Sequence, residues 1–192
     1  MKTALLFLAT LLLRDEAALR DAFAKEIKAK DAAKRVEALK KLAGAKEEKT
    51  VELLAHALKD AALEVRKAAA ETLEGCTDGA GVAIKPLGEI LVDKKADLDL
   101  RLACAKAIVK ARYKSEAFPY LYKTISTIEP EERQFHKFGG QVTQLLDGYM
   151  GKSFGQLKTT AERWDEWWMD NKAALLKEDE KKHEEWKKEQ GK

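Results

Sequence analysis

The chain has 192 residues, of which 45% are hydrophobic, 36% are charged and 7% are aromatic. This hydrophobic content is too high for a disordered chain, and 11 glycines and 3 prolines are too few for an all-β sandwich. The 36 basic and 33 acidic residues give a net charge of +3, too balanced for a basic nucleic-acid-binding domain, and two cysteines exclude a disulfide-rich scaffold or a multi-cysteine zinc site.

An apolar run, Thr3–Leu13, follows Lys2 near the start of the chain. One basic residue followed by such a run fits a secretory signal, and the run is shorter than the roughly 20 residues that a membrane-spanning helix needs. Charged residues at positions 14–16 stand where a cleavage site with small residues would be expected. We therefore expect an exported or periplasmic protein without a membrane span. The alternative is a cytoplasmic protein in which residues 1–30 form a helix that caps the core.

The middle of the chain contains a repeated helical pattern. Three similar segments follow one another: Arg35–Gly44, Val65–Gly75 and Leu100–Lys110. Aligning their arginines brings three sets of positions into register: Ala38, Ala69 and Cys104; Leu39, Ala70 and Ala105; Leu42, Leu73 and Ile108. The intervals of 31 and 35 residues are typical of helical repeat proteins, and Arg133 begins a more divergent fourth unit after 32 more.

A second amphipathic helix is predicted after each of these segments. Its apolar residues follow the i, i+3, i+4, i+7 spacing in three sets: Val51, Leu54, Ala55 and Leu58; Ile84, Leu87 and Leu91; Phe118, Leu121, Tyr122, Ile125 and Ile128. Pro86 and Pro119 are predicted near the starts of two of these helices, where a missing N–H costs little. We expect Leu73, Leu87 and Ile108 to be core residues at the interfaces between repeats.

The segment VRKAAAETLEG, followed by IKPLGEIL, resembles the HEAT repeat family, and the resemblance covers roughly residues 31–130. It implies an all-α fold, an α-solenoid of stacked helical hairpins, and usually a protein-binding scaffold; we assign residues 31–146 to these repeats. It also implies that the repeated arginines lie at helix starts and reach an acidic residue of a neighbouring repeat. Asp31, Asp97 and Asp99 are the candidate partners, and solvated arginines are the alternative.

Residues 147–176 depart from the repeat, with a glycine-rich turn (147–155) before a helix that carries Trp164, Trp167 and Trp168. Together with Phe154 and Gly155, this ending resembles the tail of many bacterial exported HEAT-repeat proteins. We expect a Trp-rich capping helix, because the open end of a repeat array must be covered; an aromatic ligand platform is the alternative. Trp167 should point elsewhere, while Trp164 and Trp168 pack on Phe118, Leu121 and either Leu145 or Leu146.

Residues 177–192 carry six acidic and six basic side chains. Glu178–Lys182 and Glu184–Lys188 are favourable i, i+4 pairs. We expect a charged, solvated helical tail that frays, with Trp186 exposed. Folding of Trp186 back onto the chain, or its docking on a partner, are the alternatives.

The sequence offers no recognisable catalytic or metal-binding motif. The three histidines are far apart, and Cys76 and Cys104 form no C-x-x-C pair, so we expect two buried, free thiols. The glycine-rich stretch Gly75–Gly81 follows a helix and not a strand, which favours a turn over a phosphate-binding loop. We predict no catalytic residue, no cofactor and no metal.

These observations favour a non-enzymatic scaffold that binds another protein. Stacking would align the second helices into an inner ridge, where the candidate binding residues are Glu52, His56, Lys59, Lys85, Glu89, Tyr120 and Lys123. Their mixed charges predict no nucleic acid; the partner's identity and the oligomeric state stay open. The alternative is a HEAT-like enzyme of the phycobilisome-lyase or DNA-glycosylase type, which a deep pocket with convergent polar groups would favour over a shallow ridge.

Overall fold

The computed structural model describes residues 16–76, 81–128, 133–154 and 160–189, and within these ranges the chain is all-helical, without a strand. The apolar run Thr3–Leu13 lies outside them. The helices are α2 (Glu16–Glu26), α3 (Ala32–Lys40), α4 (Glu48–Ala57), α5 (Leu63–Glu74), α6 (Gly81–Val92), α7 (Leu98–Ile108), α8 (Lys114–Ser126), α9 (Arg133–Met150) and α10 (Thr160–Glu189).

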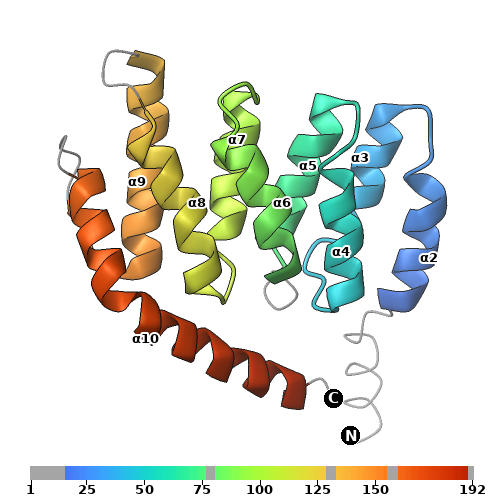
Figure 1. Cartoon of the computed structure of the whole chain (residues 1–192). Coiled ribbons are helices and arrows are strands. Elements are labelled where there is room, and N and C mark those ends of the chain that lie inside the picture. Colours follow the sequence, from blue (N-terminus) through green and yellow to red (C-terminus); the bar gives the residue numbers. More distant parts are fainter. Residues whose placement is uncertain (1–15, 77–80, 129–132, 155–159, 190–192) are drawn as a thin grey trace, which may run out of the picture.

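The helices form two rows (Figure 1). The first row consists of α3, α5, α7 and α9, each packed against the next, and α2 precedes it. The second row consists of α4, α6 and α8, and α10 packs against α8. The rows are joined by contacts of α4 with α5, α6 with α7 and α8 with α9. Helices that are alternate in sequence are therefore neighbours in space.

The core lies between the two rows, where the repeated apolar positions meet. All nine positions that the sequence alignment brings into register are at most 2% exposed. Leu73 and Leu87 are each 2% exposed and Ile108 is fully buried, so the prediction that these are core residues is confirmed. The small residues Ala38, Ala69 and Cys104 have no exposed surface, which allows the first-row helices to approach closely.

The arginines of the three aligned segments do not pair with Asp31, Asp97 or Asp99, although Arg35 does reach an acidic residue next to the following repeat, Asp60. Arg35 donates to the carbonyls of Ala29 and Lys30, and Arg66 makes the equivalent bonds to the carbonyls of Asp60 and Ala61. Arg35 also forms a two-pronged ion pair with Asp60, at 2.8 and 2.9 Å. The backbone carbonyls before each helix are thus the common partner, because a guanidinium group satisfies several acceptors at once.

The third arginine, Arg101, is buried and differs from the other two. Its Nε donates to the carbonyl of Leu91 at 2.8 Å, and its guanidinium lies 4.6 Å from the centre of the Phe138 ring. Asp97 instead accepts from the backbone N–H of Leu100 at the start of α7, and both Asp97 and Asp99 pair with Lys67. Asp31 similarly caps α3 by accepting from the backbone N–H of Ala33. The predicted acidic partners are therefore helix caps and lysine partners.

Helix ends differ from the predicted ones at three places. Pro86 and Pro119 lie inside α6 and α8, since both helices begin five residues before their proline. Helix α9 continues through Met150, four residues into the segment predicted as a turn, and Gly151 follows it with φ of +68°. A glycine in the left-handed region is a common way to end a helix, because other residues are strained there.

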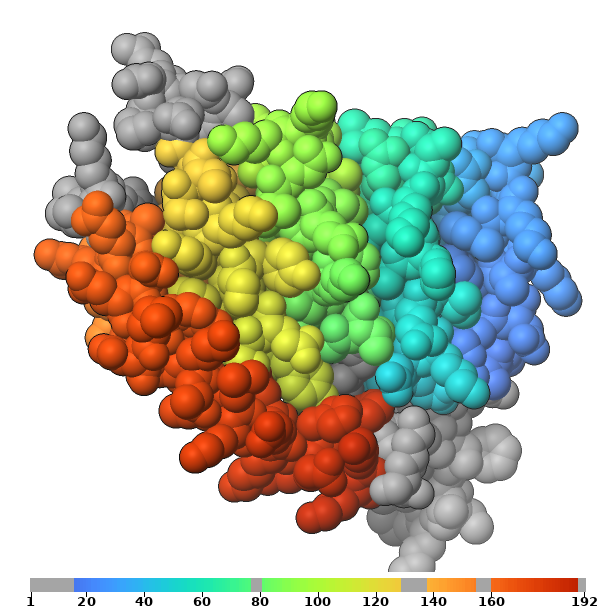
Figure 2. Space-filling view, viewed as in Figure 1, coloured from blue at the N-terminus to red at the C-terminus, as the bar shows by residue number. Residues whose placement is uncertain are grey.

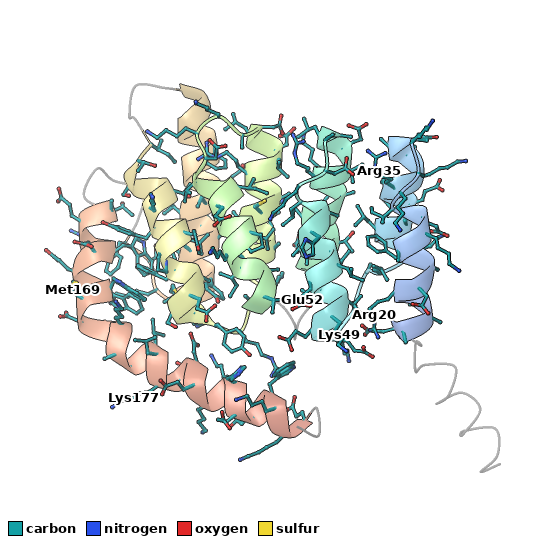
Figure 3. The ribbon with its side chains drawn as sticks, turned by 45° about the vertical axis from the view of Figure 1, so that its right-hand side comes forward. Arg20, Arg35, Lys49, Glu52, Met169 and Lys177 are labelled. Atoms are coloured by element: carbon teal, nitrogen blue, oxygen red, sulfur yellow. The ribbon has the colours of Figure 1, made fainter. Side chains whose placement is uncertain are left out.

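Helix α10 is continuous from Thr160 to Glu189, so the tail predicted after residue 177 belongs to the same helix as the tryptophans. It descends beside α8 and α9 and then runs below the starts of α8 and α6 (Figure 1). Met169 and Lys177 lie on its outer side (Figure 3), whereas Asp179 and Trp186 are each only 6% exposed. The expectation of an exposed Trp186 is therefore wrong. The tail is helical, as expected, and most of its charged side chains are exposed, but one face of it is buried.

Candidate functional site

The predicted binding residues lie along the second row, on α4, α6 and α8 or directly after α4. Six are exposed and one, Tyr120, is half-buried: Glu52, His56 and Lys59 lie on the first of these segments, Lys85 and Glu89 on α6, and Tyr120 and Lys123 on α8. The face of the second row is visible above α10 in Figure 2. The structure thus brings the seven residues onto three neighbouring helices, and their part in binding stays a prediction.

Tyr120 has a packing role in this row besides its predicted binding role. A Cβ atom on Gly88 would lie 2.3 Å from the Tyr120 ring, so the ring packs directly on the backbone of α6. Partial burial raises the pKa of Tyr120, and the charge of Glu89 raises it further. Tyr120 therefore fixes the approach of α8 to α6 and brings its phenol near Glu89.

The three tryptophans at the start of α10 surround one ring of α8. Phe118 stacks on Trp168 at 4.5 Å between ring centres and lies 5.7 Å from Trp164 and 6.0 Å from Trp167. Trp164 is fully buried, which supports a cap. The expectation that Trp167 points elsewhere is wrong, because residues three and four apart share a helix face, and Trp167 and Trp168 therefore flank Trp164.

A second candidate site is a cavity of about 420 Å³ between α10 and the starts of α4, α6 and α8. Its volume falls within the range of about 300–1,000 Å³ that small-molecule sites occupy. Four carboxyl groups, three aromatic or imidazole rings and several smaller groups line it: Glu48, Gly81, Val82, Tyr113, Ser115, Glu116, Leu176, Asp179, Glu180, His183 and Trp186. None of the seven residues predicted for binding is among the residues that line it.

Asp179 on α10 caps the start of α8 and so joins the two helices on either side of the cavity. Its Oδ2 accepts hydrogen bonds from the backbone N–H and the hydroxyl of Ser115, both at 2.7 Å. The residue at the capping position itself, Tyr113, provides no side-chain bond to α8. Asp179 therefore supplies the acceptor that an N-cap residue would normally provide.

Rings of α10 and α8 form one wall of the cavity. The Tyr113 hydroxyl and His183 Nδ1 are 3.2 Å apart, and the two rings meet edge to face at 6.0 Å between centres. His183 in turn stacks on Trp186 at 5.8 Å. The contacts run from the start of α8 to the last turns of α10, so the far end of α10 is held by aromatic as well as polar contacts.

The cavity carries a negative field. Partial burial raises the pKa of Glu116, the charge of Asp179 raises it further, and His183 opposes both. Burial also raises the pKa of Tyr113; Arg112 opposes this, whereas Glu116, Asp179 and Glu48 add to it. Three carboxylates thus act on one phenol, which means that their fields overlap inside the cavity.

Among the described residues, neither the cysteines nor the possible metal ligands form a further reactive site. Cys76 and Cys104 are free and buried, as predicted. Burial raises the pKa of the Cys104 thiol to about 12 and also raises that of Cys76, so neither is a thiolate at neutral pH. Among the described residues, His, Cys, Asp and Glu form no group of three that could hold a metal ion.

Sequence reasoning missed the cavity because its residues come from four helices that are far apart in the chain. Asp179, His183 and Trp186 do recur at spacings of four and three, which is the spacing of one helix face. This spacing was the available signal for a shared helix face, but the many charged residues around it predicted exposure to solvent. Of the predicted ion pairs, Glu178–Lys182 is present at 2.7 Å, whereas Glu184 pairs with Lys187 and not with Lys188.

Comparison of the chain with family models, curated proteins and solved structures gives no match. In the part of the chain that the structure describes, each helix is either too short or too polar to cross a lipid bilayer.

Proposed function

We propose that this protein is a HEAT-like α-solenoid that acts as a non-enzymatic scaffold and binds another protein through its second row. The observation that carries the proposal is the alignment of α4, α6 and α8, each in contact with the next. Such an arrangement joins the exposed faces of successive helices into one extended surface, which is how helical repeat proteins present binding surfaces.

The chemistry of the second row supports a protein partner. Three lysines and two glutamates are interspersed along it, and His56 and Tyr120 add groups that both donate and accept hydrogen bonds. Surfaces of mixed charge favour specific pairing with a complementary protein, whereas a nucleic acid requires a predominantly basic surface.

An enzyme of HEAT-like fold is the competing proposal, and the cavity under α10 is the observation that favours it. Two features favour binding over catalysis there. Among the described lining residues Ser115 is the one hydroxyl nucleophile besides Tyr113, and it donates its proton to the capping carboxylate of Asp179 and not to a histidine base. The four lining carboxylates also repel phosphates, which is unfavourable for a DNA glycosylase.

The scaffold proposal is tested by comparing two triple variants. The first reverses three exposed lysines of the second row, Lys59→Glu, Lys85→Glu and Lys123→Glu. The matched control reverses three exposed lysines of the first row, Lys34→Glu, Lys40→Glu and Lys106→Glu. Proteins captured by immobilised wild type and variants are quantified by mass spectrometry. We expect a partner that the control retains and the second-row variant loses at least tenfold; equal retention by both variants would contradict the proposal.

We also propose export to the periplasm or beyond in a bacterial cell, on the basis of the run Thr3–Leu13 after Lys2. Intact-mass measurement of the protein isolated from its native cells tests this. A mature chain that begins shortly after residue 13 supports export, and a chain that retains Met1 or Lys2 supports the cytoplasmic alternative, in which the segment covers the core.

A further inference from the structure

The cavity between α10 and the second row combines three properties: a volume of small-molecule size, clustered carboxylates and an aromatic wall. It measures about 420 Å³, and the described residues of its lining include Glu48, Glu116, Asp179 and Glu180 but no lysine or arginine. A ligand that enters it meets negative charge from α4, α8 and α10 together. An anionic ligand is therefore disfavoured.

Asp179 provides the observation that points to a cation. The residue is only 6% exposed, and its Oδ2 is used by Ser115. Its Oδ1 is buried without a hydrogen-bond donor. Lys182 Nζ lies 3.9 Å from this oxygen, beyond hydrogen-bond distance, and its closer partner is Glu178 at 2.7 Å. This oxygen has no surface open to a water-sized probe, so a ligand meets the charge of Asp179 through its electric field and not through a direct hydrogen bond. The long ion pair with Lys182 offsets that charge only in part.

The remaining walls fit an organic cation better than a metal ion. Val82, Leu176 and the ring of Trp186 offer apolar surface, and Tyr113 offers an electron-rich ring. Ring faces attract ammonium groups, and the attraction strengthens where water is excluded. A metal ion would need several ligands converging on one point, which the described histidines, cysteines and acids do not provide.

We propose that this cavity binds an alkylammonium group. The charges of Glu116 and Asp179 and the rings of Tyr113 and Trp186 attract the ammonium, and Val82 and Leu176 pack on the aliphatic part. The group has two sources, a free aliphatic amine or a lysine side chain of another protein. The proposal is independent of the scaffold function, because its residues are separate from the lysines and glutamates of the second-row face.

Two probes distinguish these sources by isothermal titration calorimetry on the full chain. Cadaverine represents a free amine, and the peptide acetyl-Gly-Lys-Gly-amide represents a lysine side chain; 1-pentanol and glutarate are the neutral and anionic controls. We expect saturable binding of at least one amine probe and none of the controls. Because charge dominates, binding should weaken severalfold between low and physiological salt. Absence of saturable binding by both amine probes would overturn the proposal.

Three variants connect binding to the cavity. Glu116→Gln and Glu180→Gln each remove one charge from the lining, and their combination should raise the Kd at least tenfold. Glu71→Gln is the matched control, because Glu71 is an exposed glutamate of the first-row helix α5 outside the lining, and it should leave the Kd unchanged. Equal weakening by the control and the double variant would indicate nonspecific attraction and reject the site. Unchanged circular dichroism and melting temperature verify that the variants fold.

A variant at Asp179 tests the contribution of its buried charge to binding. Asp179→Asn keeps an oxygen that can accept the bonds from Ser115 but replaces the other oxygen with an amide donor. We expect the Kd for the better amine probe to rise by more than in Glu116→Gln, since the buried charge is lost. A Kd equal to that of wild type would contradict the role of Asp179, and a melting temperature within a few degrees of wild type shows that the cap persists.

Discussion

The two halves of α10 attach to the rest of the protein in different ways. Near its start, Trp164 is fully buried and touches the rings of Phe118, Phe154 and Trp167. Near its end, burial depends on a carboxylate that caps α8 and on the stacked pair of His183 and Trp186. The first half is held by apolar packing, which is nondirectional and large in energy, and the second by a few directional contacts.

One helix therefore combines a stable cap, its start with the three tryptophans, with a more weakly attached end around Asp179, His183 and Trp186, here called the strap. Separation of the two halves under mild denaturation is expected, because local opening follows the density of buried apolar contacts. The second half also forms one side of the cavity, so its release would open the cavity without removing the cap.

The largest expected effect comes from the first half. Trp164→Ala should lower the free energy of unfolding by about 3–5 kcal/mol, as other buried tryptophan truncations do. Urea denaturation followed by circular dichroism measures it. The control is Met169→Ala in the same helix, whose side chain is 75% exposed, and which should stay within about 0.5 kcal/mol of wild type. Similar losses in the two variants would refute the assigned packing.

The second half should contribute less. A chain that ends at Lys177 loses the Asp179 cap, worth about 1 kcal/mol, and the burial of Trp186, worth about 1.5–3 kcal/mol. The released segment regains conformational entropy, so we expect a net loss of about 1–3 kcal/mol. Urea denaturation again measures it, and a truncation without effect would mean that the strap is not docked in solution.

Asp179 can be separated from the rest of the strap. Asp179→Ala should cost about 0.5–2 kcal/mol, because the first turn of α8 loses its acceptor, whereas Asp179→Asn should cost much less, since Asn is as good a cap as Asp. Glu180→Ala, an exposed neighbour, is the control and should be neutral. Thermal unfolding measures all three, and an equal loss in the Ala and Asn variants would argue against capping.

The smallest effect is expected at the exposed pair of Glu178 and Lys182. Glu178→Gln should cost about 0.3–0.5 kcal/mol at neutral pH. The hydrogen bond from Lys182 lowers the pKa of Glu178 below its ordinary value of 4.5. The contribution is therefore complete above pH 4.5 and disappears as the pH falls through the lowered pKa. Stability curves of wild type and variant should converge at acidic pH; a constant difference would contradict the ion pair.

The contrast between the cap and the strap also explains which parts of the fold could be predicted from the sequence. Helical periodicity located the helices of both rows and the buried positions Leu73, Leu87 and Ile108, because apolar spacing is set by the helix itself. It also located the cap, through the density of tryptophan. What the sequence could not show was the strap, since Asp179 and Trp186 are surrounded by charges that indicate solvent.

The two candidate sites differ in the same way, because the second-row face could be predicted from the sequence and the cavity could not. Residues of the second-row face were named from repeat position alone, and the structure places them on neighbouring helices. The cavity needs the start of α8 beside residues of α10 that are 64 positions away, as the bond from Ser115 to Asp179 shows. No local pattern encodes such a distance. The arginine contacts were missed for a different reason, because their partners are backbone carbonyls five and six residues away, which carry no sequence signal.

The cap on α8 has a consequence for synthesis on the ribosome. Asp179 emerges 64 residues after Ser115, which at about 5–20 residues per second is a delay of about 3–13 seconds. During that interval the residues of α2 to α7 have already been synthesised, whereas the first turn of α8 still lacks the carboxylate that caps it. The nascent chain thus passes through a stage in which α8 has been synthesised and the carboxylate that caps it has not.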